Sequence, residues 1–279
     1  MRIKGKVSII MPTYNRAFCL WKAILSIQSQ TYTDWELIVV DDRSTDDTYK
    51  LVREFKADSR IKYFINNGKH SAAGARQTGL EIADGDYIAY LDSDNTVSSN
   101  WLATMVDRLK RYPEAVFAYP DMNFSMMILE GEDYKVVRET SKYAFEPTVE
   151  NLWNHKFEGD PNGLVHLGKA RKHLKWDLNL SLYEDYDYSL QLASKYPNGM
   201  LYIPLALVNY VRLYGEAGVC NDVNYSDIIK NLKYLKKKYA ANSLWTQSNW
   251  YDELIGKYEV FAAQGKTPRE RIVEKYGSR

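Results

Sequence analysis

The hydrophobic positions of the first ninety residues change period repeatedly, from short apolar runs to stretches with helical spacing. Short apolar runs predict buried strands, and apolar side chains three or four positions apart predict helices. The predicted strands cover residues 6–11, 35–40, 60–65 and 86–91. The predicted helices cover residues 17–30, 45–56 and 71–83. In the first helix, Phe18, Trp21 and Leu25 fall on one stripe.

This order of strands and helices predicts an α/β fold, with a Rossmann-like, mostly parallel sheet and helices on both faces. Crossovers between parallel strands are right-handed, so the carboxyl ends of the strands share one edge. Ligands of such sheets bind outside those ends. Polar clusters directly follow three of the strands, at residues 13–16, 41–46 and 92–95. We therefore expect these distant clusters to meet at one edge of the sheet.

The pattern changes after residue 95. The later predicted elements are a helix at 101–112, a strand at 115–119, a hairpin of 125–129 with 134–138, helices at 148–154 and 184–196, and one or two strands at 201–212. Beyond about residue 215 the chain is rich in lysine and tyrosine and has helical spacing. We expect a main domain over residues 1–215, divided near residue 96, and a helical C-terminal extension over 216–279.

Composition narrows the classes of function. The net charge of +1, from 37 basic and 36 acidic residues, gives no electrostatic basis for binding nucleic acid. Cys19 and Cys220 are too few for a disulfide framework and favour a reducing compartment. No secretory signal and no apolar stretch of about 20 residues is present. We therefore expect a cytoplasmic protein without a transmembrane segment.

Two acids one residue apart, Asp92 and Asp94, follow the apolar strand at 86–91. Carboxylate oxygens are hard ligands that suit Mg²⁺ or Mn²⁺. Such a cation usually takes one or two protein carboxylates and completes its shell with phosphate oxygens and water. The alternative is a polar turn that caps the helix at 101–112. The position at the end of a strand favours a metal site.

Further residues at the same edge suit recognition of a nucleotide. Asp42 can accept hydrogen bonds from a base or a ribose, although a cap for the helix at 45–56 is the alternative. Pro12 fixes the backbone before Tyr14, whose ring can stack on a base. Arg76 lies among small residues that let a ligand approach, and its charge suits a diphosphate. Neither a G-x-G-x-x-G fingerprint nor a P-loop accompanies it.

The acid pair Glu184 and Asp185 begins the helix at 184–196. A carboxylate at a helix start is often only a cap or a partner of the helix dipole. A hydroxyl that attacks a substrate, however, requires a general base, and Asp185 is the best candidate for one. The four histidines match no zinc motif. Of these, His166 is the candidate for a contact near the cleft.

Together these segments resemble glycosyltransferase family 2, the inverting class with the GT-A fold. The matching segments are residues 7–16, 38–46, 74–77, 85–94 and 183–187. Each segment alone is common, but their order and spacing agree over about residues 6–212, which makes the combination specific. The resemblance implies a metal-dependent enzyme of cell-surface polysaccharide or glycoconjugate synthesis. It would move a sugar from a nucleotide-sugar donor, a UDP-sugar above all, to a hydroxyl of a carbohydrate or lipid-linked sugar acceptor.

The resemblance also implies roles for individual residues. In the nucleotide-sugar half, residues 1–96, the nucleotide-binding residues would be Pro12, Thr13, Tyr14, Arg16, Asp42, Arg76, Asp92 and Ser93. Asp94 would hold Mn²⁺ or Mg²⁺ on the diphosphate. In the acceptor half, residues 97–215, Asp185 would be the catalytic base. Phosphate or acceptor contacts would come from Glu184, Arg212 and His166. Many family members have a His or Arg after the last core strand. In this sequence, residues 210–214 contain Arg212 but no His.

Two other functions stay open at this stage. A non-catalytic homologue would bind a nucleotide sugar without turnover, although the intact acids argue against it. A sugar nucleotidylyltransferase shares a related core but requires a Gly-rich loop after the first strand, which residues 12–15 do not provide. In the extension, the lysines around Leu235 fit either a solvated amphipathic helix or peripheral contact with the inner face of an anionic membrane.

Overall fold

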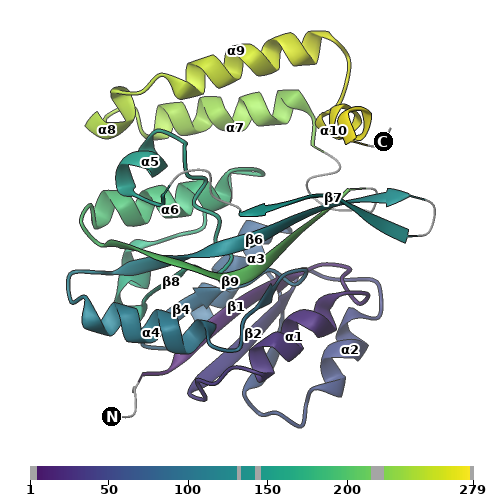
Figure 1. Ribbon diagram of the computed structural model, residues 1–279, viewed down its shortest axis with the longest axis vertical. Coiled ribbons are helices and arrows are strands. Elements are labelled where there is room, and N and C mark those ends of the chain that lie inside the picture. Colours follow the sequence, from purple (N-terminus) through teal and green to yellow (C-terminus); the bar gives the residue numbers. More distant parts are fainter. Residues whose placement is uncertain (1–4, 131–132, 142–145, 215–222, 277–279) are drawn as a thin grey trace.

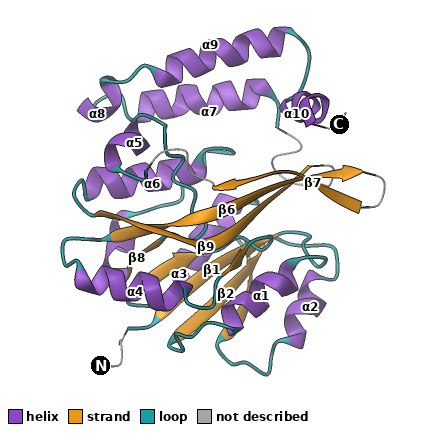
Figure 2. Cartoon of the chain, in the orientation of Figure 1, coloured by secondary structure: helices purple, strands orange, loops and turns teal. Residues whose placement is uncertain are grey.

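The computed structural model describes residues 5–130, 133–141, 146–214 and 223–276. One nine-stranded sheet runs through the chain, with helices on both faces (Figures 1 and 2). The strand order is β3 (Ile61–Ile65), β2 (Trp35–Asp41), β1 (Val7–Thr13), β4 (Tyr87–Tyr90), β8 (Val165–Leu167), β6 (Phe117–Glu130), β9 (Met200–Tyr214) and β5 (Thr96–Val97), and β7 (Asp133–Ser141) pairs with β6. The predicted α/β class with helices at its C-terminal end is confirmed.

The four N-terminal strands are parallel, as predicted. Successive side chains of a strand point to opposite faces. Accordingly Ile9 packs with the core on one face and Ile10 with the core on the other. The first core is covered by α1 (Leu20–Gln28), α2 (Thr48–Glu54) and α4 (Trp101–Arg111), and the second by α3 (Ala72–Ile82).

The stripe of the first helix that packs against the sheet differs from the stripe that the sequence analysis identified. Leu20 and Ile24 are fully buried, whereas Phe18, Trp21 and Leu25 are 48%, 40% and 45% exposed. Both sets have helical spacing and lie about one position apart, so period alone could not choose between them.

The second half of the sheet has mixed strand directions. β8 runs antiparallel to both β4 and β6, β9 is parallel to β6, and β5 is antiparallel to β9. The sequence analysis missed β5, β8 and the short helix η1 (Gly168–His173), since such short elements show no period. The predicted hairpin is confirmed, but its first strand is the end of β6, which begins at Phe117. Residues 201–212 belong to the single strand β9.

The remaining helices follow later in the chain, and all but the last of them contribute side chains to the second core, on the α3 face. They are α5 (Val149–Trp153), α6 (Glu184–Lys195), α7 (Tyr225–Lys238), α8 (Ser243–Thr246), α9 (Trp250–Ala263) and α10 (Pro268–Tyr276). α7 and α9 lie side by side (Figure 1). Trp245 is fully buried in the second core, together with Leu235 of α7 and Trp153 of α5. The extension therefore shares a core with the main domain, and the predicted boundary at 215/216 falls outside the described residues. Among the described residues, no helix combines the length and the apolar character needed to cross a bilayer.

Candidate active site

The polar clusters after β1, β2 and β4 lie together at the carboxyl edge of the sheet. Thr13, the last residue of β1, is opposite Asp41, the last residue of β2. The backbone N–H of Asp42 donates to the Thr13 carbonyl at 2.8 Å, and that of Leu91 donates to the Ile10 carbonyl at 3.2 Å. The loops that leave these three strands therefore start side by side.

The two acids after β2 have different surroundings. Asp41 accepts hydrogen bonds from the backbone N–H and the hydroxyl of Ser44 at 2.8 and 2.6 Å, so it closes the turn toward α2. Asp42 is 5% exposed, accepts from Nδ2 of Asn66 at 2.6 Å and lies 2.7 Å from Nδ1 of His70. Burial raises the pKa of Asp42. Asp42, rather than Asp41, thus belongs to the wall of the site.

The loop after β1 continues this wall. The Tyr14 ring meets His70 edge-on, with centroids 4.9 Å apart, and stays 45% exposed. Pro12 and Thr13 are buried, and within the described part of the chain Thr13 Oγ1 has no hydrogen-bond partner. A buried hydroxyl without a partner is costly unless a ligand or water satisfies it. The orphan hydroxyl of Thr13 thus marks this edge as a place where a water or a ligand would complete the hydrogen bonding.

Arg76 joins the acids of the two halves of the main domain. Its Nη2 donates to Oδ1 of Asp92 at 2.7 Å, and its Nη1 donates to Oε1 of Glu184 at 3.2 Å. The guanidinium lies 4.9 Å from the centre of the Trp176 ring, and the side chain is 6% exposed. Burial alone would lower the pKa of Arg76, but these two carboxylates raise it. The arginine is therefore a permanent buried cation at the centre of the site.

Asn162 holds the Asp92 carboxylate from the opposite side. Its Oδ1 accepts the backbone N–H of Asp92 at 2.7 Å, and its Nδ2 donates to Oδ2 of Asp92 and Oδ1 of Asp160, both at 2.8 Å. Asp160 is 4% and Asn162 1% exposed. The loop that connects to β8 thus brings a further buried acid to the site.

Asp94 lies in the same turn, with little compensating charge. The cation of Arg16 lies beside it, with Nε 3.8 Å from Oδ2 of Asp94. Burial and the charge of Asp92 raise the pKa of Asp94 to about 6. Neighbouring carboxylates with excess negative charge suit a divalent cation. Of the two acids, Asp94 suits Mn²⁺ or Mg²⁺, whereas both oxygens of Asp92 already accept hydrogen bonds from Arg76 and Asn162. The described residues contain no group of three or more His, Cys, Asp or Glu side chains placed to hold a metal. Ser93, between the two acids, is 4% exposed.

Glu184 and Asp185 begin α6 next to this cluster. The residue before them, Tyr183, has a left-handed φ of 62°, which turns the chain into the helix. Burial and the charges of Glu184 and Asp160 raise the pKa of Asp185 well above its usual range. A carboxylate with a raised pKa is a stronger base than an ordinary one. The surroundings of Asp185 thus suit a proton acceptor.

Arg212 and His166 differ in their placement. Val211, beside Arg212 in β9, donates its N–H to Oδ1 of Asn95 at 2.8 Å, which brings β9 to the Asp94 turn. His166, in contrast, is fully buried: its Nδ1 lies 2.9 Å from the Leu167 carbonyl and its Nε2 3.0 Å from the Tyr188 hydroxyl. Both ring nitrogens are engaged within the core. The expected contact of His166 with phosphate or acceptor therefore stays a prediction, and these two contacts do not support it.

The burial of His166 also predicts how the stability of the protein changes at low pH. Burial lowers its pKa to about 4, from 6.5. As the pH falls below 6.5 the unfolded chain takes up a proton that the folded chain refuses, so stability falls with pH. Between pH 7 and pH 4 we expect a loss of about 3 kcal/mol from this group. The free energy of unfolding, measured with urea between pH 7 and pH 4, should fall less for His166→Gln than for the wild type. An equal fall in both proteins would contradict a lowered pKa of His166.

A cavity of about 600 Å³ opens at the other end of β4, away from these acids. Its lining includes Lys169, Arg171 and Lys172 and one acid, Asp86. This basic hollow lies at the start of β4, whereas the acid cluster lies where β4 ends. The candidate active site is the carboxyl edge of the sheet, where the titratable groups converge.

The family assignment agrees with this geometry. The profile of "Glycosyl transferase family 2" matches residues 8–172. The chain belongs to this family. The match covers β1 to η1, and so includes every predicted nucleotide-binding residue and Asp94. The Glu184–Asp185 pair lies beyond it.

Named relatives are similar to part of this family chain. The chain is 45% identical over 105 residues to the GalNAc(5)-diNAcBac-PP-undecaprenol beta-1,3-glucosyltransferase of Campylobacter jejuni. These residues make up 37% of this chain and 34% of the relative. The chain is 47% identical over 103 residues to the UDP-Glc:alpha-D-GlcNAc-diphosphoundecaprenol beta-1,3-glucosyltransferase WfgD of Escherichia coli, 37% of this chain and 40% of the relative. The chain thus matches well under half of the length of either relative.

Solved structures support the fold. The crystal structure of S. aureus TarS 1-349 in complex with UDP-GlcNAc superimposes with a TM-score of 0.66 and 18% identity, covering 91% of this chain and 71% of TarS 1-349. At this identity the likeness concerns the fold alone. It confirms the predicted GT-A architecture.

The sequence analysis missed four residues that support the family's predicted site: Asn66, His70, Asp160 and Asn162. Asn66 opens an Asn-Asn-Gly turn after β3, and Asp160 and Asn162 lie between two glycines. Polar residues in such turns are the signal that could have found them. The rule for parallel strands would place Asn66, directly after β3, at this edge. Nothing in the sequence showed that the loop with Asp160 and Asn162 returns to the same edge.

Proposed function

We propose that this chain is an inverting glycosyltransferase that moves a sugar from a UDP-sugar to a hydroxyl of a lipid-linked sugar acceptor, in cell-surface polysaccharide or glycoconjugate synthesis. The bridge that Arg76 makes between Asp92 and Glu184 carries the proposal, because it unites the acids of both halves in one site. The names of the C. jejuni and E. coli relatives, glucosyltransferases with undecaprenol-linked substrates, support the acceptor class. The protein would then work in the cytoplasm, in peripheral contact with the membrane that holds the acceptor.

The nucleotide is proposed to bind across the loops after β1, β2 and β4. Two buried donor atoms support this position, since Thr13 Oγ1 and Arg76 Nε have no hydrogen-bond partner among the described residues. Asp42 and the exposed ring of Tyr14 would take the base. The proposed nucleotide-binding residues are Pro12, Thr13, Tyr14, Arg16, Asp42, Arg76, Asp92 and Ser93.

Asp94, with Asp92 beside it, is proposed to hold Mn²⁺ or Mg²⁺. When bound, the cation would neutralise charge on the departing nucleoside diphosphate. Arg16, 3.8 Å from Asp94, would steady that carboxylate from the side of α1. Arg212 is the proposed further contact for the phosphates.

Asp185 is proposed to be the general base. It takes the proton of the acceptor hydroxyl while that oxygen bonds to the anomeric carbon. The bond from this carbon to the diphosphate oxygen breaks at the same time, and the diphosphate leaves with the electron pair. A single displacement of this kind inverts the configuration at the anomeric carbon. Glu184, held by Arg76, fixes the first turn of α6 beside the donor.

Calorimetry with UDP tests the donor site and its metal. We expect UDP to bind at least about tenfold more tightly with Mn²⁺ than with EDTA, because a cation held by Asp94 would offset the charge of the diphosphate. Asp94→Asn should remove this dependence, whereas Asp47→Asn, at a site 77% exposed, should keep it. A screen of UDP-sugars for hydrolysis then identifies the donor. Absence of metal-dependent binding of any nucleoside diphosphate would count against the proposal, and binding without hydrolysis or transfer would indicate a non-catalytic homologue.

A further inference from the structure

The C-terminal helix α7 packs against the segment that carries the proposed base. We infer that α7 positions Asp185 for catalysis, with Lys238 as the principal positioning residue. The inference rests on the proposed function and adds a role for a part of the chain that lies outside the family match. It is carried by contacts of α7 on both sides of the Glu184–Asp185 pair.

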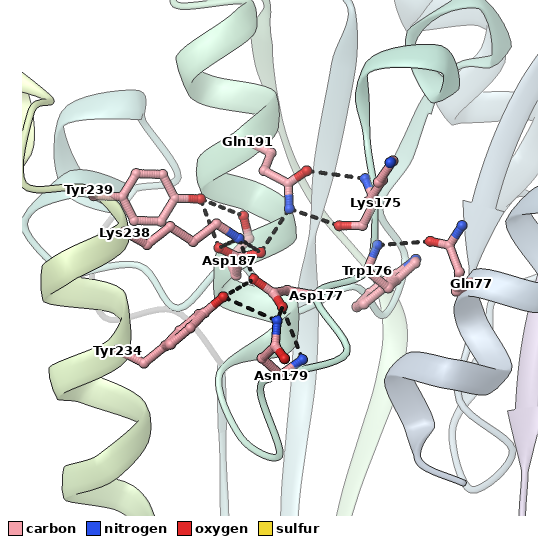
Figure 3. Close-up of polar contacts among 10 residues, drawn as sticks. All are labelled: Gln77, Lys175, Trp176, Asp177, Asn179, Asp187, Gln191, Tyr234, Lys238 and Tyr239. Carbon is pink, nitrogen blue, oxygen red and sulfur yellow. Dashed lines mark hydrogen bonds and ion pairs between the residues drawn. The ribbon is translucent and has the colours of Figure 1, made fainter. Parts of the chain in front are cut away.

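Lys238 binds two acids at the two ends of this segment (Figure 3). Its Nζ lies 2.7 Å from Oδ2 of Asp177 and 2.7 Å from Oδ1 of Asp187. Asp187 is fully buried, and it also accepts hydrogen bonds from the Tyr239 hydroxyl at 2.8 Å and from Nε2 of Gln191 at 2.7 Å. One cation therefore ties the loop before α6 to its first turn, two residues beyond Asp185.

Two more residues on the same face of α7 hold the loop between those acids. The Tyr234 hydroxyl donates to Oδ2 of Asp177 at 3.0 Å. Oδ1 of Asn231 accepts the backbone N–H of Ser181 at 3.0 Å, and its Nδ2 donates to the Ser181 hydroxyl at 3.1 Å. Positions 231, 234 and 238 recur at spacings of three and four, so they form one stripe of the helix. The stripe faces the whole loop that leads into the catalytic pair.

The start of the same loop is attached to the donor site. The backbone N–H of Trp176 donates to Oε1 of Gln77 at 3.0 Å, and its indole lies under Arg76. The loop is thus fixed by α3 at one end and by α7 along its length. A general base must lie within hydrogen-bond reach of its proton, and a displacement of about 1 Å can cost about 100-fold in rate. The position of Asp185 relative to the donor therefore depends on α7.

The test is Lys238→Met in the full chain, assayed for transfer and for UDP binding. Methionine keeps most of the length of the side chain but leaves Asp177 and Asp187 without their shared cation. We expect kcat to fall about 10- to 100-fold, with the KM for the donor and the Kd for UDP changed less than about twofold. Lys238→Arg should recover most of kcat. A normal kcat in Lys238→Met, or an equal loss of UDP affinity, would overturn the inference.

Two control variants separate positioning from general loss of stability. Lys236→Met removes an ion pair of the same helix, that with Asp252 at 2.7 Å, where both side chains are about half exposed, so kcat should not change. Leu109→Ala destabilises the core on the opposite face of the sheet. At an assay temperature where it and Lys238→Met are both folded, Leu109→Ala should keep its kcat. An equal loss of kcat in Leu109→Ala would mean that Lys238 affects kcat only by stabilising the fold, and the inference would be wrong.

Hydrogen exchange gives a readout that does not depend on transfer. In Lys238→Met, backbone amides of residues 177–188 should exchange faster, while those of β1 and β2 should not change. If the wild type transfers no sugar but this local change occurs, the proposed function fails and the restraint by α7 stands. If the wild type is active and the exchange of 177–188 is unaltered, the restraint by α7 is wrong and the proposed function is untouched.

Discussion

Replacing Asp185 by asparagine is expected to lower kcat for sugar transfer by about 1,000-fold, with the affinity for UDP nearly unchanged. The amide has the shape of the carboxylate but cannot accept the proton of the acceptor hydroxyl. UDP affinity is retained because the proposed nucleotide contacts lie on the loops after β1, β2 and β4 and on α3. Single-turnover transfer assays and calorimetry with UDP measure the two quantities separately.

Two other acids, one next to Asp185 and one on a distant exposed turn, provide the controls for this result. Glu184→Gln should affect binding as well as turnover, because Glu184 is a partner of Arg76. Asp47→Asn, on an exposed turn, should change neither. Transfer by Asp185→Asn at close to the wild-type rate would remove Asp185 from the mechanism. Loss of turnover alone in Glu184→Gln would move the role of base to Glu184.

The donor edge could be predicted because parallel strands bring their carboxyl ends to one edge. Asp42 and Asp92 are separated by two helices and two strands in the chain, yet the rule for parallel strands alone placed both of their loops at one edge. The same rule does not apply to Asn162, which reaches Asp92 through β8, an antiparallel strand of three residues. So short a strand has no detectable period, and its direction is set by tertiary pairing.

Other features depend on packing that local pattern does not encode. His166 was an expected ligand contact, but its ring is enclosed by aromatic residues that are distant in sequence. The lysines of α7 suggested a solvated or membrane-facing stripe. In the structure Lys238 binds the buried Asp187, and Lys233 pairs with Glu259 of α9. Whether a lysine meets water or an acid is decided by the element that packs against it, and one sequence does not show that.

Replacing Arg76 by methionine is expected to lower the free energy of unfolding by about 3–5 kcal/mol and to abolish detectable binding of the donor. The variant leaves Asp92 and Glu184 without the buried cation between them. It also removes the charge that opposes the raised pKa of Asp185, so this pKa should rise further. Urea unfolding and calorimetry with the UDP-sugar test both effects. Arg76→Lys should restore little, because an ammonium lacks the planar fork with which the guanidinium bonds to both carboxylates over the Trp176 ring.

The matched control for Arg76→Met is Arg111→Met, whose arginine pairs with Asp107 at 2.8 Å on the surface of α4 and is 68% exposed. An exposed pair of this kind contributes about 0.5 kcal/mol, so neither stability nor binding should change appreciably. If Arg76→Met is as stable as Arg111→Met and still binds the donor, the bridge between the two halves is not what holds the site together. If Arg76→Met is instead stable but no longer binds the donor, Arg76 acts mainly as a contact for the ligand and only secondarily as a structural residue. The Nε atom, which has no hydrogen-bond partner among the described residues, and the adjoining Trp176 ring would then matter more than the two ion pairs.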